Sequence, residues 1–300
     1  MIGYKGRVGV IGATSIVGEY LLPLLVKEGW NVVAFSRQAQ YIKKSAGKQP
    51  IIWQLLVKSK SSDTDIYQIE KPINFWICLA PIMVLPEYFP LLLLSGAKHV
   101  VAISSTSRFT KRVSSDQAEQ ELAESFAENE ERLESWAKKE KLTFTILRST
   151  MVYGLGRDKN INTIASFVRR FPFFCAFGDA RGLRQPLHAQ DVALCCVAAL
   201  SSGAAINQCY NISGGEIISC REMVCRIFVA LGKKPLIIKI PLWFFRLVFF
   251  VLRMFPRFSK WSPAMAERMN QDLIFNHEEA SRDLGFRPRP FCLTEEDLPR

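Results

Sequence analysis

The chain opens with an apolar strand pattern that runs directly into a loop bounded by glycines, and a helix pattern follows at once. The strand is Val8–Ile11, the loop runs from Gly12 to Gly18, and helical apolar spacing continues from Ile16 to Glu28. In a βαβ unit that holds a dinucleotide, the first glycine permits the tight turn after the strand, and the last lets the helix pack on the sheet. No other feature of the sequence restricts the possible folds as much.

The loop suits the pyrophosphate of a nicotinamide dinucleotide. Backbone amides at a helix N-terminus hold phosphate groups. Ser15 stands where the middle glycine usually lies, and its hydroxyl can donate a hydrogen bond to a phosphate oxygen. The predicted pyrophosphate-binding residues are Gly12, Ala13, Thr14, Ser15, Ile16, Val17 and Gly18.

Strand and helix patterns alternate through the first half of the chain. Short apolar runs typical of strands follow at 31–35, 51–57, 73–79, 99–104 and 143–147, and a helix pattern covers 114–140. Such alternation predicts an α/β fold of the Rossmann type, a doubly wound parallel sheet with helices on both faces. We expect the dinucleotide domain in residues 1–160, completed by about 184–203, and a smaller C-terminal substrate-binding region in residues 161–300.

The end of the second strand bears on the choice of cofactor. An acidic residue there binds the ribose hydroxyls of NAD, whereas this chain has Ser36 and Arg37. Arg37 can pair with a 2′-phosphate, which favours NADP, while stacking of its guanidinium on the adenine would leave NAD open.

Composition excludes several classes of protein. Lys and Arg number 39 against 28 Asp and Glu, a net charge of +11, yet there is no basic run of five residues and no nucleic-acid-binding motif. The eight cysteines form no C-x-x-C pair, so we expect no metal site and a reducing compartment. Residues 1–7 lack the apolar core of a signal peptide, and we expect a cytoplasmic protein with no nucleic-acid partner.

Several further motifs follow the glycine loop in order along the chain. They are Leu79-Ala80-Pro81, Ser104-Ser105-Thr106, Leu147-Arg148-Ser149-Thr150-Met151-Val152-Tyr153-Gly154, Arg184-Gln185-Pro186-Leu187-His188-Ala189-Gln190-Asp191-Val192-Ala193, Tyr210-Asn211-Ile212-Ser213-Gly214-Gly215 and Leu284-Gly285-Phe286. Together they resemble the extended or atypical short-chain dehydrogenase/reductases, the NAD-dependent epimerase/dehydratase family. The resemblance implies an oxidoreductase or epimerase with a small-molecule substrate of the nucleotide-sugar or lipid-linked type.

The resemblance also implies roles for the matching positions. The residues implied to line the cofactor are Leu79, Ala80, Pro81, Ser104, Arg148, Ser149 and Thr150. Ser104, Ser105 and Thr106 occupy the position of the family's catalytic serine. The residues expected on the substrate side are Tyr153, Asn160 and Arg184.

One departure from the family concerns the chemistry. The family uses a Tyr-x-x-x-Lys pair for proton transfer, but residues 114–134 contain neither tyrosine nor lysine, and Ala123 and Ala127 fall at the two positions. The glutamates of this helix lie mostly between its apolar residues, so we expect this charge run to form a solvated face and not a site. Two functions stay open, an enzyme with a substitute group (Thr106, Tyr153, His188 or another residue) or a non-catalytic sensor or assembly subunit that binds NADP.

Residues 242–255 form an apolar segment in which Arg246 and Arg253 are the only charged residues. As a helix it would be about 21 Å long, too short to cross a hydrocarbon core of about 30 Å. It can lie in a membrane interface, at the inner membrane face, or be buried in the core or a homodimer contact. A second aromatic run, 167–177 with Arg169 and Arg170, can extend the same surface.

Overall fold

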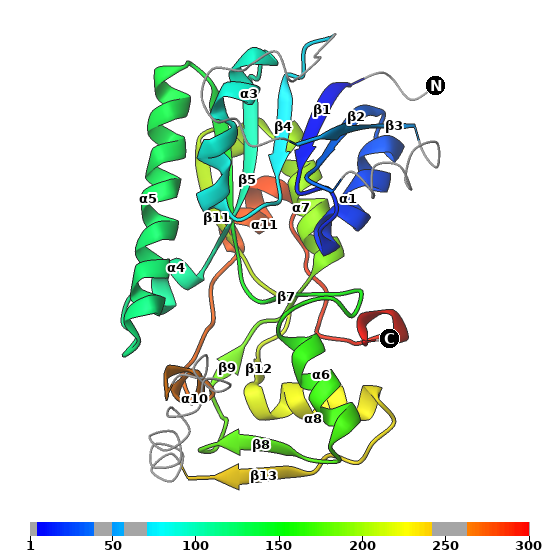
Figure 1. Cartoon of the computed structure of the whole chain (residues 1–300), viewed down its shortest axis with the longest axis vertical. Helices are drawn as coiled ribbons and strands as arrows, with labels where there is room; N and C mark the ends of the chain where they lie inside the picture. Colours follow the sequence, from blue (N-terminus) through cyan, green and yellow to red (C-terminus); the bar gives the residue numbers. More distant parts are fainter. Residues whose placement is uncertain (1–4, 39–49, 57–70, 242–262, 300) are drawn as a thin grey trace.

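The computed structural model describes residues 5–38, 50–56, 71–241 and 263–299. Seven of its strands form one parallel sheet in the order β11-β6-β5-β4-β1-β2-β3 (Figure 1). These strands are β1 (Gly6–Ile11), β2 (Trp30–Ser36), β3 (Ile51–Leu55), β4 (Phe75–Cys78), β5 (His99–Ser105), β6 (Thr143–Ser149) and β11 (Gln208–Ile212). The α/β fold with a doubly wound parallel sheet is confirmed. Six of the strands were predicted, and β11 is an addition at the edge.

Helices cover both faces of the sheet. One face packs against α1 (Ile16–Lys27), α7 (Ala189–Ser201) and α11 (Glu278–Leu284), which share one apolar core with the sheet. The other face packs against η2 (Ile82–Tyr88), α3 (Phe89–Leu94) and the long α5 (Gln117–Lys139), around a second core. The strands therefore carry apolar side chains on both faces, as parallel strands between two helical layers do.

The strand order reverses beside β1, which lies between β2 and β4. Close packing at this position explains a glycine inside β1. A Cβ built on Gly9 would lie 2.7 Å from the indole ring of Trp76, so the glycine makes room for that ring against the sheet. Ligands of such sheets bind at the carboxyl ends of the strands where the order reverses, and here that is the end of β1.

A second lobe lies beyond the carboxyl ends of the strands (Figure 1). Its elements are β7 (Val152–Tyr153), α6 (Ile161–Arg170), β8 (Phe174–Phe177), β9 (Leu183–Arg184), β10 (Leu187–His188), β12 (Ile218–Ser219), α8 (Cys220–Ala230), β13 (Ile237–Ile240), α10 (Pro263–Arg268) and η5 (Glu295–Asp297). Three two-stranded pairs, β10-β7, β12-β9 and β13-β8, link these elements around a core of their own. The chain returns to the sheet layer for α7, η3 (Gly203–Ala205) and β11.

The apolar segment 242–255 lies outside the described residues. In the parts of the chain that are described, no helix has both the length and the apolar character needed to span a bilayer. Within those same parts, no group of three His, Cys, Asp or Glu side chains is placed to hold a metal ion.

Candidate functional site

The loop between β1 and α1 is held against the end of β4. Gly12 has φ +78°, a conformation that favours glycine, and a Cβ at this position would lie 2.8 Å from the backbone nitrogen of Ala80. A Cβ on Gly18 would overlap the carbonyl oxygen of Ala13. Both glycines are thus required by close packing. A larger residue at position 12 would push the loop away from the end of β4, and one at position 18 would displace the Ala13 carbonyl.

Ser15 begins α1 as its N-cap. Its Oγ accepts a hydrogen bond from the Gly18 nitrogen at 3.1 Å, which leaves the hydroxyl proton able to donate to an anion. The side chains of Ala13 and Val17 are buried in the core, so these two residues can offer a ligand only their backbone. Thr14 and Ile16 are partly exposed at the same turn. The turn therefore presents backbone amides and one hydroxyl, a donor set that fits a pyrophosphate.

The end of β2 lies beside this loop, since β1 and β2 are paired from Gly6 to Ile11. Ser36 is buried, and its Oγ accepts a hydrogen bond from the Gln38 nitrogen at 3.1 Å. Arg37 is exposed, and among the described residues it has no ion-pair partner. Its guanidinium is therefore available to an anionic ligand.

The residues after β4 form the opposite wall of this end of the sheet. The Leu79 nitrogen donates to the Ile11 carbonyl oxygen at 2.9 Å, which continues the pairing of β4 with β1. Ala80 is half-buried against Gly12, and Pro81 is exposed at the start of η2.

Hydroxyl groups gather at the ends of β5 and β6. The Ser104 Oγ donates to the Glu130 carboxylate at 2.5 Å, and the Thr106 Oγ1 donates to the Ser149 carbonyl oxygen at 3.2 Å. Ser104 and Thr106 are both buried. Ser105 is half-buried, and its Oγ accepts from the Ser107 nitrogen at 3.1 Å, so its own proton is not used in that contact. Of the three residues at the catalytic-serine position, Ser105 therefore has the most accessible hydroxyl.

The last residue of β6 and the residue after it are also held by hydrogen bonds. Ser149 is buried and donates to the Ser104 carbonyl oxygen at 3.2 Å. The Thr150 hydroxyl donates to the Gln185 carbonyl oxygen at 2.7 Å. Both contacts fix the backbone at the strand ends, while Thr150 itself stays half-buried at the edge of the site.

Glu130 is the feature that the sequence prediction placed wrongly. It was expected on the solvated face of the helix, but its side chain is fully buried on α5. Its carboxylate accepts two hydrogen bonds from Arg148, at 2.9 and 2.6 Å, and pairs with Arg108 as well as with Ser104. The heptad spacing of the buried residues Ala123, Glu130 and Ala137 was the signal that could have shown this.

Two arginines therefore share one buried carboxylate. Burial by itself would lower the pKa of the Arg148 guanidinium, but the hydrogen bonds and charge of Glu130 outweigh it and raise that pKa. Arg108 and Arg148 also flank the ring of Phe109, with guanidinium carbons 5.6 and 5.5 Å from its centroid. Ala123, one of the two alanines at the positions of the family's proton-transfer pair, is buried on the same helix.

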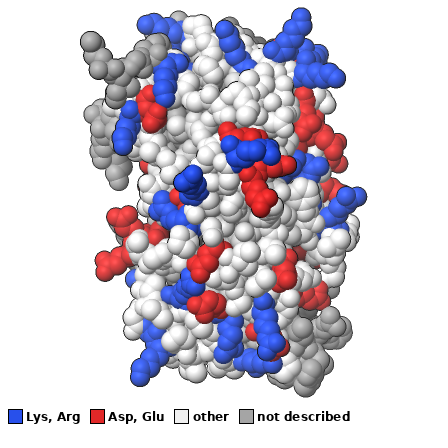
Figure 2. All heavy atoms as spheres, turned by 180° about the vertical axis from the view of Figure 1, so that it is seen from behind, with Lys and Arg blue, Asp and Glu red and all other residues white. Residues whose placement is uncertain are grey.

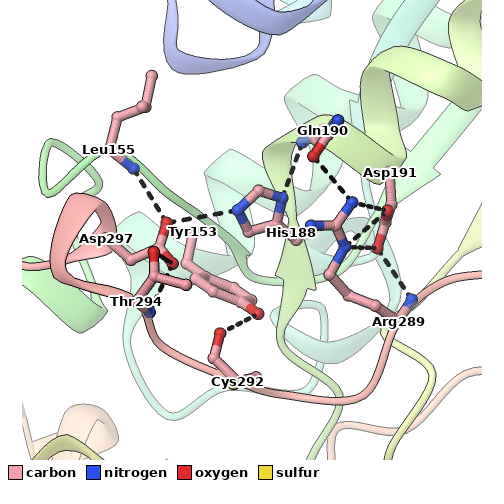
Figure 3. Close-up of polar contacts among 9 residues, drawn as sticks. All are labelled: Tyr153, Leu155, His188, Gln190, Asp191, Arg289, Cys292, Thr294 and Asp297. Carbon is pink, nitrogen blue, oxygen red and sulfur yellow. Dashed lines mark hydrogen bonds and ion pairs between the residues drawn. The ribbon is translucent and has the colours of Figure 1, made fainter. Parts of the chain in front are cut away.

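The residues predicted on the substrate side lie in three different settings. Tyr153 is fully buried, and its hydroxyl donates to the Cys292 carbonyl oxygen at 3.1 Å (Figure 3). Burial raises the pKa of this phenol well above its ordinary value. Asn160 is exposed at the start of α6, where Asp158 rather than Asn160 caps the helix by accepting from the Ile161 nitrogen at 2.6 Å.

Arg184 is a buried cation. Its guanidinium donates to the carbonyl oxygens of Leu183 at 2.7 Å and Gln271 at 2.6 Å, and to that of Arg268. No carboxylate of the described chain forms a salt bridge with Arg184, and desolvation lowers its pKa. A buried positive charge without a counter-ion is costly, so this position suits an anionic ligand.

His188, the third candidate proton carrier, is held in a structural network (Figure 3). Its Nδ1 accepts from the Gln190 nitrogen at 3.1 Å, so Nε2 carries the proton and donates to the Asp297 carboxylate at 3.3 Å. Asp297 also accepts from Thr294, and Arg289 pairs with Asp191 nearby. Both ring nitrogens are thus engaged, and the C-terminal segment is fastened to the start of α7.

Parts of the chain are similar in sequence to known proteins. Residues 92–213 match the model of the NAD dependent epimerase/dehydratase family. A UDP-glucose 4-epimerase from Vibrio cholerae is 28% identical over 124 residues, which cover 40% of this chain and 37% of that protein. A chloroplastic divinyl chlorophyllide a 8-vinyl-reductase from Arabidopsis thaliana is 22% identical over an alignment covering 97% of this chain and 72% of the reductase.

Solved structures share the fold over nearly the whole chain. A UDP-glucuronic acid 4-epimerase from Bacillus cereus in complex with NAD has a TM-score of 0.71 at 17% identity, covering 97% of this chain and 93% of that one. A UDP-glucose 4-epimerase from Thermotoga maritima with UDP-glucose has a TM-score of 0.64 at 15% identity, covering 94% and 93%. At these identities the likeness concerns the fold.

Proposed function

Because residues 92–213 match the model of the NAD dependent epimerase/dehydratase family, we propose that this chain binds NADP or NAD and acts as an oxidoreductase or epimerase. Its substrate is a nucleotide-sugar-like or lipid-linked small molecule. The observation that carries this proposal is the loop from Gly12 to Gly18, packed on Ala80 where the strand order reverses.

The cofactor would lie across the ends of β1, β2 and β4. The amides of the loop and the Ser15 hydroxyl would hold the pyrophosphate, and Leu79, Ala80 and Pro81 would form the wall after β4. Arg37 would pair with a 2′-phosphate, which makes NADP the preferred dinucleotide. The nicotinamide would reach the ends of β5 and β6, next to Ser104, Arg148, Ser149 and Thr150.

The substrate would lie between the sheet and the second lobe. Arg184 supports an anionic substrate, because its buried guanidinium is bonded only to carbonyl oxygens within the described chain. Asn160 is exposed at the start of α6 and could reach a polar group of the substrate. Tyr153 would act by shaping this wall, since its hydroxyl is bonded to Cys292.

A bound nicotinamide supplies hydride acceptance and donation, and the protein supplies position and polar contacts. Ser105 is the group that we assign to the substrate oxygen, because its proton remains free to donate. Ser104 and Thr106 would hold the strand ends in place through Glu130 and Ser149. General acid–base help is worth about 10²- to 10⁴-fold, so an enzyme without the Tyr-x-x-x-Lys pair is expected to be slow.

The alternative is a non-catalytic sensor or assembly subunit that binds NADP. It is favoured by Ala123 at the tyrosine position and by His188, whose two ring nitrogens are both engaged. Membrane contact through 242–255, a homodimer and a cytoplasmic location remain predictions.

Turnover separates the two functions. The protein is loaded with NADP or NAD and mixed with UDP-glucose or UDP-glucuronic acid, while reduced nicotinamide and epimerised sugar are measured. The enzyme is expected to show turnover that falls in Ser105→Ala but not in Ser201→Ala, an exposed serine in the last turn of α7. Saturable cofactor binding without turnover on a wide panel of sugar nucleotides and carbonyls would favour the non-catalytic function.

A further inference from the structure

The far end of the second lobe exposes a group of aromatic rings. Phe167, in the last turn of α6, is 36% exposed, and Phe171, just after it, is 38% exposed. Their ring centroids lie 4.9 Å apart, and the ring of Phe173 lies 6.0 Å from Phe167. Large apolar groups that are clustered on a surface usually mark a contact with another molecule or a membrane.

Aliphatic side chains from a second segment lie beside these rings. The Lys233 ammonium donates to the carbonyl oxygens of Val168 at 2.7 Å and Arg169 at 2.9 Å, which brings the turn after α8 onto the end of α6. Leu236 in this turn is 52% exposed, and Ile238 on β13 is 44% exposed. We call Phe167, Phe171, Phe173, Leu236 and Ile238 the apolar end of the lobe.

Basic residues surround the apolar end. Arg169 and Arg170 are exposed in the last turn of α6, and Lys234 is exposed in the adjacent turn. The Arg170 guanidinium carbon lies 5.5 Å from the centroid of the Phe171 ring. Figure 2 shows several Lys and Arg side chains around the lower end of the molecule, where the second lobe lies.

Acidic residues are missing from the segments that build this end. The sequence has no Asp or Glu from 159 to 178, and none from 223 to 241. Asp179, which follows the first of these segments, pairs with Lys239. The apolar end is therefore an exposed aromatic and aliphatic surface with an excess of positive charge.

We propose that the apolar end docks on an anionic lipid bilayer. The rings and aliphatic side chains enter the interfacial layer, while Arg169, Arg170 and Lys234 contact lipid phosphates. A nucleic acid is a poorer partner, because bases stack on aromatic rings but gain little from Leu236 and Ile238. The inference does not depend on the proposed catalytic function.

Vesicle sedimentation tests the proposal with the full chain. Vesicles of phosphatidylcholine alone are compared with vesicles that contain an equal part of phosphatidylglycerol. The protein is expected to sediment with the anionic vesicles and to be released by high salt. In Arg169→Glu/Arg170→Glu, partitioning should fall about 20-fold or more, since a basic residue near an anionic surface is worth about fivefold.

Two apolar variants separate insertion from charge attraction. Phe167→Ser/Phe171→Ser and Leu236→Ser/Ile238→Ser should each lower partitioning by about tenfold. The matched controls are Lys138→Glu/Lys139→Glu in the last turn of α5 and Leu93→Ser/Leu94→Ser on α3, which should bind vesicles as the natural chain does. Circular dichroism spectra and thermal unfolding, unchanged in every variant, would show that the variants are folded.

Three results would overturn the proposal. The first is no sedimentation with either vesicle, and the second is binding that survives both the Arg and the apolar substitutions. The third is tight binding to heparin that is lost with the Arg substitutions but not with the apolar ones, which would identify a polyanion site instead.

Discussion

Removal of the charge on Glu130 is the sharpest test of how the site is held together. Its carboxylate is fully buried and accepts from Ser104, from Arg108 and twice from Arg148. Glu130→Gln keeps the shape of the side chain but leaves two guanidinium groups at the edge of the core without this buried counter-ion. Breaking a buried ion pair in this way costs about 3 to 5 kcal/mol.

Urea unfolding measures that loss. With a slope of about 3 kcal/mol per M, expected for a chain of this size, the midpoint should fall by about 1 to 1.7 M. Glu131→Gln is the matched control, because Glu131 is the exposed neighbour on the same helix, and its effect should stay within about 0.5 kcal/mol. Equal midpoints for Glu130→Gln and Glu131→Gln would refute the view that this buried cluster anchors α5 to β5 and β6.

Three further predictions concern the cofactor loop, the end of β2 and the C-terminal segment. Gly12→Ala should weaken NADPH binding, followed by its fluorescence, about tenfold or more, because φ is +78° and the Cβ would meet Ala80; Gly203→Ala, at an open position, should bind normally. Arg37→Ala should weaken NADPH binding about 10- to 100-fold in the same assay and leave NADH unchanged, and equal losses for both would contradict a 2′-phosphate contact. Burial favours the protonated form of Asp297, but hydrogen bonds from His188 and Thr294 outweigh it and lower its pKa to about 2. This carboxylate therefore adds about 2 kcal/mol of stability above its unfolded pKa of about 3.8, which is lost as the pH falls towards 2. Asp297→Asn should flatten that part of an acid-unfolding curve, and a curve with unchanged shape would count against the network.

Local patterns were sufficient for six of the seven strands of the sheet and for the glycine loop. The strands are short apolar runs between helices, and the loop after β1 has its glycines where the turn and the helix packing require them. Edge strand β11 was missed. It follows α7 in the sequence and pairs with β6, so its place in the sheet depends on a contact between distant parts of the chain.

The polar contacts of the site were less predictable because they join distant parts of the chain. Glu130 is charged and lies in a helix rich in glutamate, so only its heptad spacing distinguished it from its exposed neighbours. Tyr153 stands in a motif that implies a role at the substrate, yet its hydroxyl bonds to the Cys292 carbonyl oxygen, far along the sequence. The engagement of His188 Nε2 likewise depends on Asp297, 109 positions further along the sequence.

Calorimetric titration with NADPH and NADH tests the central claim, that the turn between β1 and α1 holds the pyrophosphate of a nicotinamide dinucleotide. The expected result is saturable heat for one site per chain, with NADPH the tighter ligand. No heat for either dinucleotide, on protein that circular dichroism shows to be folded, would contradict the claim.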